Sequence, residues 1–155
     1  MSPVIQCGSR KDAVHILLGL DGSVSERIAV VREGFPEHLL SRVADALGWN
    51  TRTLRDCIRK EVRRGRRGAS GVQRLGTWES ERLLRLVDMI DDVERMVASA
   101  DNIDGFVSSV WLGQWLVRSC PALGGERPAE YLVDTLEGIA LLRQLISQME
   151  SGAYA

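Results

Sequence analysis

The side chains that most often carry out chemistry are few and scattered in this sequence. Its three cysteines, Cys7, Cys57 and Cys120, lie far apart and form no CxxC pair. We therefore expect reduced thiols with a structural role, as in a reducing compartment. His15 and His38 are too isolated to form a metal site, and the sequence places no base near a nucleophile. The sequence thus predicts a protein that is not an enzyme and that uses neither a metal nor a cofactor.

Length and composition predict a folded chain. The 155 residues are 45% hydrophobic, which is enough for one good core or for two small cores that share an interface. No basic stretch followed by an apolar stretch is present at the N-terminus, and no apolar run is long enough to cross a bilayer. We expect a cytoplasmic protein that makes no membrane contact.

The charges are distributed unevenly along the chain. Residues 1–76 contain 14 Lys and Arg against 8 Asp and Glu, a balance of +6, whereas residues 77–155 contain 6 against 13, a balance of −7, which together give the net −1. A basic half and an acidic half predict two surfaces with different partners. A polyanion suits the first half, and a protein suits the second.

Apolar residues recur three and four positions apart along most of the chain, which is the period of a helix. We predict an all-α fold in which an N-terminal helix-turn-helix bundle precedes a C-terminal helical domain. Residues 1–64 form the DNA-binding region in this prediction, residues 65–76 a basic, Gly-rich linker, and residues 77–155 the second domain. The predicted helices cover about 13–20, 24–33, 36–47, 51–62, 77–98, 101–118, 128–133 and 135–152. Ser23 or Ser25 caps the second of these helices, which Gly34 ends, and Asn50 or Thr51 caps the fourth.

Residues 40–59 fit the spacing of a helix-turn-helix. Such a unit needs a small residue inside its first helix and, four positions later, a residue that tolerates left-handed backbone. Ala44 and Gly48 meet these two requirements. The apolar residues expected to hold the two helices together are Val43, Leu47, Trp49, Leu54 and Cys57.

The predicted recognition helix runs from Thr51 to about Val62. The residues near its start that could contact base edges in the major groove are Thr51, Arg52, Arg55 and Asp56. The residues expected to contact phosphates are Arg59, Lys60, Arg63, Arg64, Arg66 and Arg67. One such unit buries little surface on DNA, so we expect a homodimer on paired half-sites. The alternative is a helical hairpin whose basic face is simply solvated.

The most informative segment lies near the C-terminus. Trp115 and Leu116 end a helix, a Pro-Ala-Leu-Gly-Gly loop occupies 121–125, and Pro128 starts another helix. The prolines fix helix boundaries, and the two glycines permit backbone geometry that other residues avoid. This pattern predicts a rigid corner, which serves either a partner or only the domain's own fold.

Together with Thr135 and Gly138, these motifs resemble the C-terminal domain of the Xre/MbcA/ParS antitoxins over about residues 77–155. Cys120 departs from the pattern, because many relatives have Asn there. The resemblance implies a type II antitoxin that represses its own operon and blocks the NAD-using site of a RES-domain toxin from the adjacent gene. It places the toxin contact at Pro121, Leu123, Gly124, Gly125, Arg127, Gly152, Tyr154 and Ala155.

A second interpretation is a stand-alone helix-turn-helix regulator whose C-terminal domain dimerises or senses a ligand. The gene neighbourhood separates the two interpretations, because an antitoxin gene should lie beside a reading frame for a RES domain.

Overall fold

The all-α prediction is confirmed in a computed structural model that describes residues 23–59, 66–67, 71–99 and 104–150. Within these residues the α-helices are α2 (Val24–Glu33), α3 (His38–Leu47), α4 (Thr51–Ile58), α5 (Thr77–Ala98), α6 (Ser108–Val117), α7 (Tyr131–Asp134) and α8 (Leu136–Glu150). Two 3-10 turns, η1 (Pro121–Leu123) and η2 (Pro128–Glu130), precede α7. Strands β1 (Arg66–Arg67) and β2 (Gln73–Arg74) pair antiparallel in a short ribbon.

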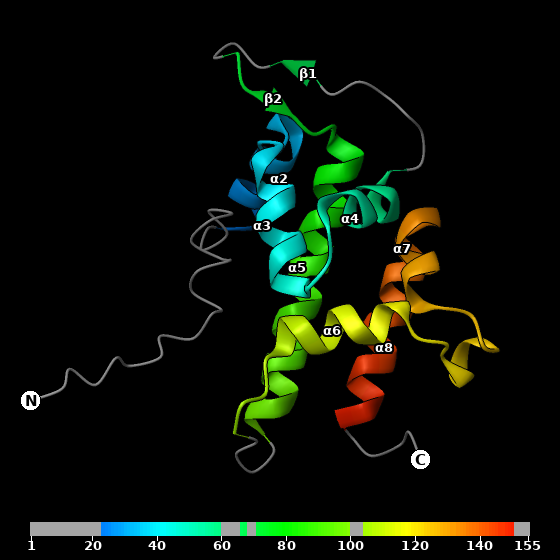
Figure 1. Cartoon of the computed structure of the whole chain (residues 1–155). Helices are drawn as coiled ribbons and strands as arrows, with labels where there is room; N and C mark the ends of the chain where they lie inside the picture. The colour runs from blue at the N-terminus through cyan, green and yellow to red at the C-terminus, as the bar shows by residue number, and fades with distance from the viewer. Residues whose placement is uncertain (1–22, 60–65, 68–70, 100–103, 151–155) are drawn as a thin grey trace, which may run out of the picture.

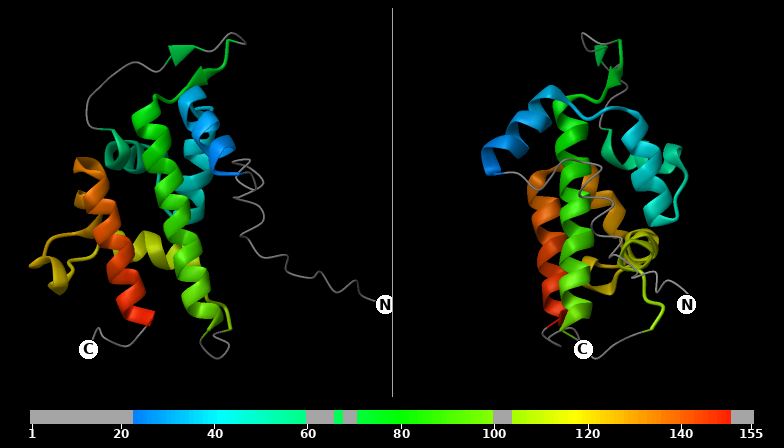
Figure 2. Two further views of the ribbon diagram at one scale, coloured as in Figure 1. Left: turned by 180° about the vertical axis from the view of Figure 1, so that it is seen from behind. Right: turned by 90° about the vertical axis from the view of Figure 1, so that its left-hand side faces the viewer.

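Helix α5 is the central element of the fold (Figure 1). Helices α2, α3 and α4 surround its N-terminal half, α6 crosses its C-terminal half, and α8 runs alongside it, as both views of Figure 2 show. The buried apolar residues of α5 are Leu83, Leu84, Leu86, Val87, Met89, Ile90 and Val93. They belong to one hydrophobic core that also contains Leu40 and Leu47 from α3 and Leu112 from α6. The predicted domains therefore share a core, and their boundaries stay a prediction.

Local sequence signals explain where several helices start and stop. Ser23 and Glu26 form a capping box at the start of α2, and Gly34 ends that helix. The Asn50 side chain accepts a hydrogen bond from the Thr53 N–H at the start of α4. The sequence offered Ser23 or Ser25 for the first cap and Asn50 or Thr51 for the second, and the structure selects Ser23 and Asn50. The predicted stop of α2 at Gly34 is confirmed.

Two helix boundaries differ from the prediction by four residues or more. Helix α4 ends at Ile58 rather than near Val62, because Arg59 adopts an extended backbone with φ −107° and ψ 115°. Helix α6 begins at Ser108 rather than near Asp101, since Gly105 takes a left-handed φ of 80° and Val107 is extended. The helix predicted at about 13–20 lies outside the described residues.

The segment predicted as a linker contains both strands of the short ribbon, which the sequence did not predict. The Leu75 N–H donates to the Phe35 oxygen (2.9 Å), and the Glu37 N–H donates to the Gln73 oxygen (3.0 Å). Leu75 and Phe35 are both buried. The apolar anchor at Leu75 fixes the end of this segment against the start of α3.

Part of the charge asymmetry is neutralised inside the molecule. Arg27 from the basic half forms an ion pair with Asp88 from the acidic half (2.7 Å), and Arg59 lies 3.6 Å from Glu79. In the described part of the chain, no helix is both long and apolar enough to span a membrane.

Candidate interaction surfaces

The turn between α3 and α4 has the backbone geometry that its sequence spacing requires. Ala44 is completely buried, so the second helix can cross close to it. Gly48 is left-handed (φ 74°, ψ 26°), and its N–H donates to the Ala44 and Asp45 oxygens. Leu47 and Leu54 are buried between the helices. These features match the spacing from which a helix-turn-helix was predicted, and DNA binding by this pair stays a prediction.

The arginines of α4 differ in how available they are for a partner. Arg52 and Asp56 are exposed, and Thr51 is half-buried. Arg55 lies 2.5 Å from Glu37 in an ion pair, and Arg59 is engaged with Glu79. Arg55 and Arg59 must therefore give up these ion pairs before they can contact DNA fully. The other predicted DNA contacts at Lys60, Arg63 and Arg64 lie outside the described residues.

A close joint connects the α3–α4 turn to α6. The Trp49 indole Nε1–H donates to the Gly113 oxygen (3.0 Å). A Cβ on Gly113 would lie 2.0 Å from the Leu47 oxygen, so only glycine permits this approach. Sequence reasoning missed this joint, although a glycine inside an apolar helix was a signal of close packing.

The Pro-Gly corner is closed by its own backbone hydrogen bonds. The Cys120 N–H donates to the Glu126 oxygen (2.9 Å), and the Cys120 oxygen accepts from Leu123 (3.0 Å) and Gly125 (3.0 Å). The Ser119 hydroxyl donates to the Gly125 oxygen (2.7 Å). Gly124 (φ 65°) and Gly125 (φ 90°) are left-handed, which explains why two glycines occur together. These bonds involve only the backbone of Cys120, so the loop closes without the Asn of many relatives.

The corner presents an exposed rim on a buried base. Pro121, Gly124, Gly125 and Arg127 are exposed, and Leu123 is half-buried. Behind this rim, the η2 residues Pro128 and Ala129 are buried and attach the corner to the core. The structure therefore brings together five of the residues predicted to bind a toxin. The other three, Gly152, Tyr154 and Ala155, lie outside the described residues.

Tyr131 and Gly138 fix the elements that follow the corner. The Tyr131 hydroxyl donates to the Glu126 Oε2 (2.7 Å), and this bond to a carboxylate raises the pKa of Tyr131. A Cβ on Gly138 would lie 2.5 Å from the Tyr131 oxygen, so this glycine allows α8 to pack closely against α7. The Thr135 hydroxyl accepts from the Gly138 N–H (3.1 Å), as expected for a helix cap.

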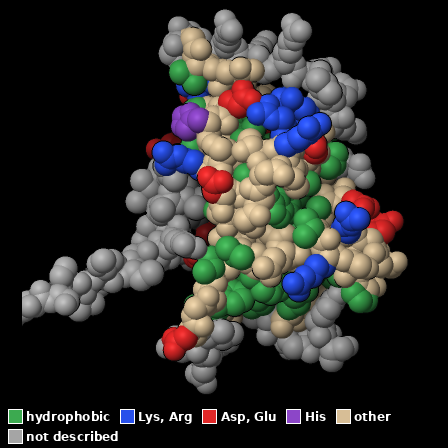
Figure 3. Space-filling view, viewed as in Figure 1, with side chains coloured by type: hydrophobic (Ala, Val, Ile, Leu, Met, Phe, Trp, Pro, Cys, Tyr) green, Lys and Arg blue, Asp and Glu red, His purple; other side chains and the backbone are tan. Residues whose placement is uncertain are grey.

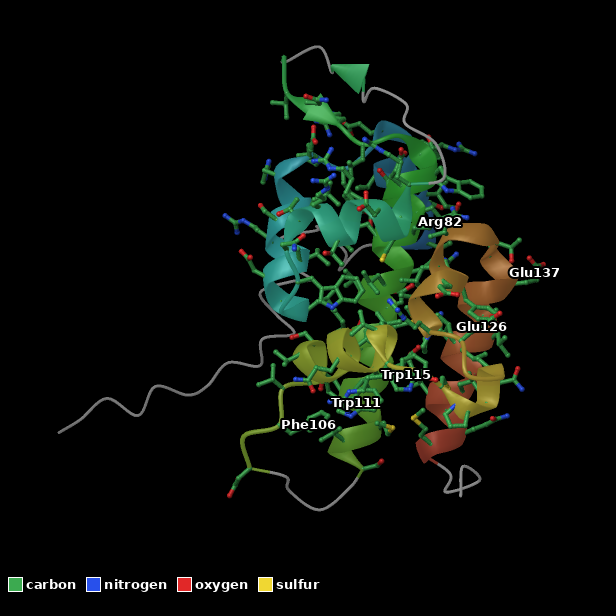
Figure 4. The ribbon with its side chains drawn as sticks, turned by 45° about the vertical axis from the view of Figure 1, so that its right-hand side comes forward. Arg82, Phe106, Trp111, Trp115, Glu126 and Glu137 are labelled. Atoms are coloured by element: carbon green, nitrogen blue, oxygen red, sulfur yellow. The ribbon has the colours of Figure 1, made fainter. Side chains whose placement is uncertain are left out.

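Arg82 is a buried positive charge that sequence reasoning did not find. It is 1% exposed, its Nε donates to the Leu132 oxygen in α7 (3.0 Å), and its guanidinium stacks on the Trp78 ring (Figure 4). Burial lowers the pKa of Arg82, while Glu81 and Glu79 act against this shift. The sequence analysis made no prediction for Arg82, because only the tertiary fold brings the α7 carbonyl to it.

No constellation that is typical of catalysis was found in the described residues. They contain no group of three or more His, Cys, Asp or Glu side chains placed to hold a metal ion. Cys57 is a free thiol with a pKa raised by burial and, to a smaller extent, by Asp56.

Comparison with known proteins identifies the family. Residues 105–152 match the family described as the antitoxin Xre/MbcA/ParS C-terminal toxin-binding domain. The chain is also 35% identical over 130 residues to the Prs ADP-ribosylating antitoxin of Sphingobium sp. (strain YBL2). These 130 residues make up 84% of this chain and 81% of the relative. The chain belongs to the Xre/MbcA/ParS family of antitoxins. It is thus an antitoxin of a toxin–antitoxin system, and its partner is a toxin.

Proposed function

We propose that this antitoxin binds a RES-domain toxin encoded by the adjacent gene and covers the cleft in which that toxin uses NAD. The observation that supports this proposal most is the closed corner at 120–126, which lies inside the match to the toxin-binding domain. A loop already fixed by its own hydrogen bonds loses little conformational entropy on binding. The exposed rim around Leu123 and Arg127 is therefore well suited to enter a cleft.

The name of the relative supports the proposal that the toxin is an ADP-ribosylating enzyme, because that name links an antitoxin to ADP-ribosylation of Prs. The acidic balance of residues 77–155 suits a cleft whose basic groups hold the phosphates of NAD. We propose that Glu126 and Glu130 contribute to this charge complementarity. We also propose a second toxin contact at the tail residues Gly152, Tyr154 and Ala155.

Co-expression with the product of the adjacent gene tests the toxin proposal. The wild-type chain should co-purify with the toxin and restore growth. Truncation after Ser151 and the substitution Arg127→Glu should each weaken this rescue, whereas Arg52→Glu should leave it intact. Full rescue by both the truncated chain and R127E would contradict the proposed contacts.

We also propose that the protein acts as a homodimer in the cytoplasm and represses its own operon through residues 40–59. The exposed side chain of Arg52 supports this proposal, since it is free to reach a base edge near the start of α4. Arg52→Glu should abolish binding to the operator fragment in a gel-shift assay. Arg32→Glu on α2 provides an exposed control with the same charge change, and equal binding by both variants would exclude α4 as the reading helix.

A further inference from the structure

Helix α6 has an outer side without charge. None of the ten residues of α6 is charged, whereas nine of the 22 residues of α5 are charged although α5 is the central helix. The inner side of α6, with Leu112, Gly113 and Leu116, packs on the core. The residues on its outer side and flanks, here called the α6 face, are Val110, Trp111, Gln114, Trp115 and Val117.

Aromatic rings form one flank of the α6 face. Trp111 and Trp115 stack at 6.1 Å between ring centroids with 8° between their planes, and Phe106 continues the row at 6.4 Å from Trp111 (Figure 4). All three side chains are half-buried, and Val117 at the end of the helix is 43% exposed. Figure 3 shows hydrophobic side chains gathered over this part of the molecule. These rings also pack against the core. Their exposed parts give the α6 face aromatic surface of the kind that is enriched where partners bind.

Two free arginines lie at the end of the α6 face. Arg118 follows α6 directly and Arg127 follows the closed corner, and both are exposed. Neither forms an ion pair with any residue in the part of the chain that the structure describes. The Cys120–Glu126 hydrogen bond closes the loop between these arginines, and the corner follows directly after α6 and Arg118 along the chain.

We infer that the α6 face and Arg118 form the main anchor for the toxin, beside the corner. This inference rests on the proposed function and enlarges the proposed contact surface for the toxin. The enlarged surface binds an apolar patch of the toxin that is bordered by a carboxylate. Two observations favour the toxin over a second copy of this chain. The match to the toxin-binding domain begins at residue 105 and so contains all of α6. The face also leads along the chain through Arg118 into the corner at 120–126, which is the proposed toxin contact.

Affinity measurements with the full-length chain and the adjacent-gene toxin test the inference. Val117→Glu places a carboxylate on the α6 face and should weaken toxin binding at least about tenfold. Val72→Glu is the matched control, because Val72 is 40% exposed and lies in the segment before β2, and it should bind as wild type does. Arg118→Glu should also weaken binding and reduce its dependence on salt.

Hydrogen exchange supplies a readout that needs no substitution. The backbone amides of residues 107–118 should gain protection when the wild-type chain binds the toxin. The inference would be overturned if exchange at these amides did not change and V117E and V72E bound the toxin with equal affinity. The proposed function would still hold in that case, because the wild-type chain binds the toxin. The inference would also be overturned if V117E lost self-association but kept its affinity for the toxin, because the α6 face would then bind a second copy of this chain. If the wild-type chain does not bind the toxin at all, the proposed function itself fails.

Discussion

Replacing Gly113 by alanine should destabilise the fold, although alanine is the better helix former. The new Cβ would lie 2.0 Å from the oxygen, 2.9 Å from the carbonyl carbon and 3.2 Å from the Cα of Leu47. All three atoms belong to the backbone at the end of α3, so no flexible side chain can move aside. Because an ordinary carbon–oxygen contact needs about 3.3 Å or more, α6 must move away by roughly 1 Å.

The expected cost follows from three contributions. Overpacking of a tight site costs about 1–3 kcal/mol, and loss of the hydrogen bond from Trp49 to the Gly113 oxygen costs about 1 kcal/mol. Alanine regains about 1 kcal/mol through its higher helix propensity. We expect the free energy of unfolding to fall by about 2 kcal/mol and Tm to fall by about 4–8 °C.

Urea denaturation followed by circular dichroism measures this change. Gln114→Ala is the matched control, since Gln114 is exposed on the same helix and its replacement should change the free energy of unfolding by less than about 0.5 kcal/mol. Trp49→Phe removes the hydrogen bond together with part of the ring that packs on the core, and it should cost about 1–2 kcal/mol. A G113A chain as stable as wild type, or more stable, would refute the close joint between α6 and the α3–α4 turn.

Three further predictions concern single contacts. Gly138→Ala should lower Tm in thermal unfolding, because its Cβ would lie 2.5 Å from the Tyr131 oxygen, and an unchanged Tm would exclude that approach. The hydrogen bond to Glu126 raises the pKa of Tyr131 above its ordinary value of 10.0, so the bond stabilises the fold fully below about pH 10 and is lost as the pH rises through the raised pKa. In ultraviolet titration Tyr131→Phe should remove the later of two phenolate transitions, and loss of the earlier one would contradict the assignment. Arg27→Met should cost about 1–2 kcal/mol in urea denaturation, because both oxygens of Asp88 accept from one Arg27 nitrogen (2.7 and 2.9 Å), and a cycle with Asp88→Asn that shows no coupling would exclude this ion pair.

The sequence predicted most helices because their signals are local. Ser23, Asn50, Gly34 and Gly48 act within one or two turns of a helix end, so spacing alone located those ends to within two residues. The start of α6 could not be predicted in this way. The apolar pattern continues back toward Asp101, and only the left-handed backbone of Gly105 shows where the helix must begin.

The interaction surfaces were predicted unevenly for the same reason. The corner at 121–125 is encoded by proline and glycine within a few residues, and its geometry follows from them. The Trp49–Gly113 joint spans 64 positions, and the bond from Arg82 to Leu132 spans 50, so neither could be found from local spacing. The engagement of Arg55 with Glu37 also depends on how α3 and α4 pack, and a list of basic residues on one helix cannot reveal it.

The affinity of the full-length chain for the product of the adjacent gene tests the central claim most directly. Isothermal titration with purified proteins should show tight binding and loss of the toxin's NAD-consuming activity at saturation. The binding should weaken in R127E and survive in R52E. A wild-type chain that neither binds nor inhibits that protein would contradict the assignment of this corner to a RES-domain toxin.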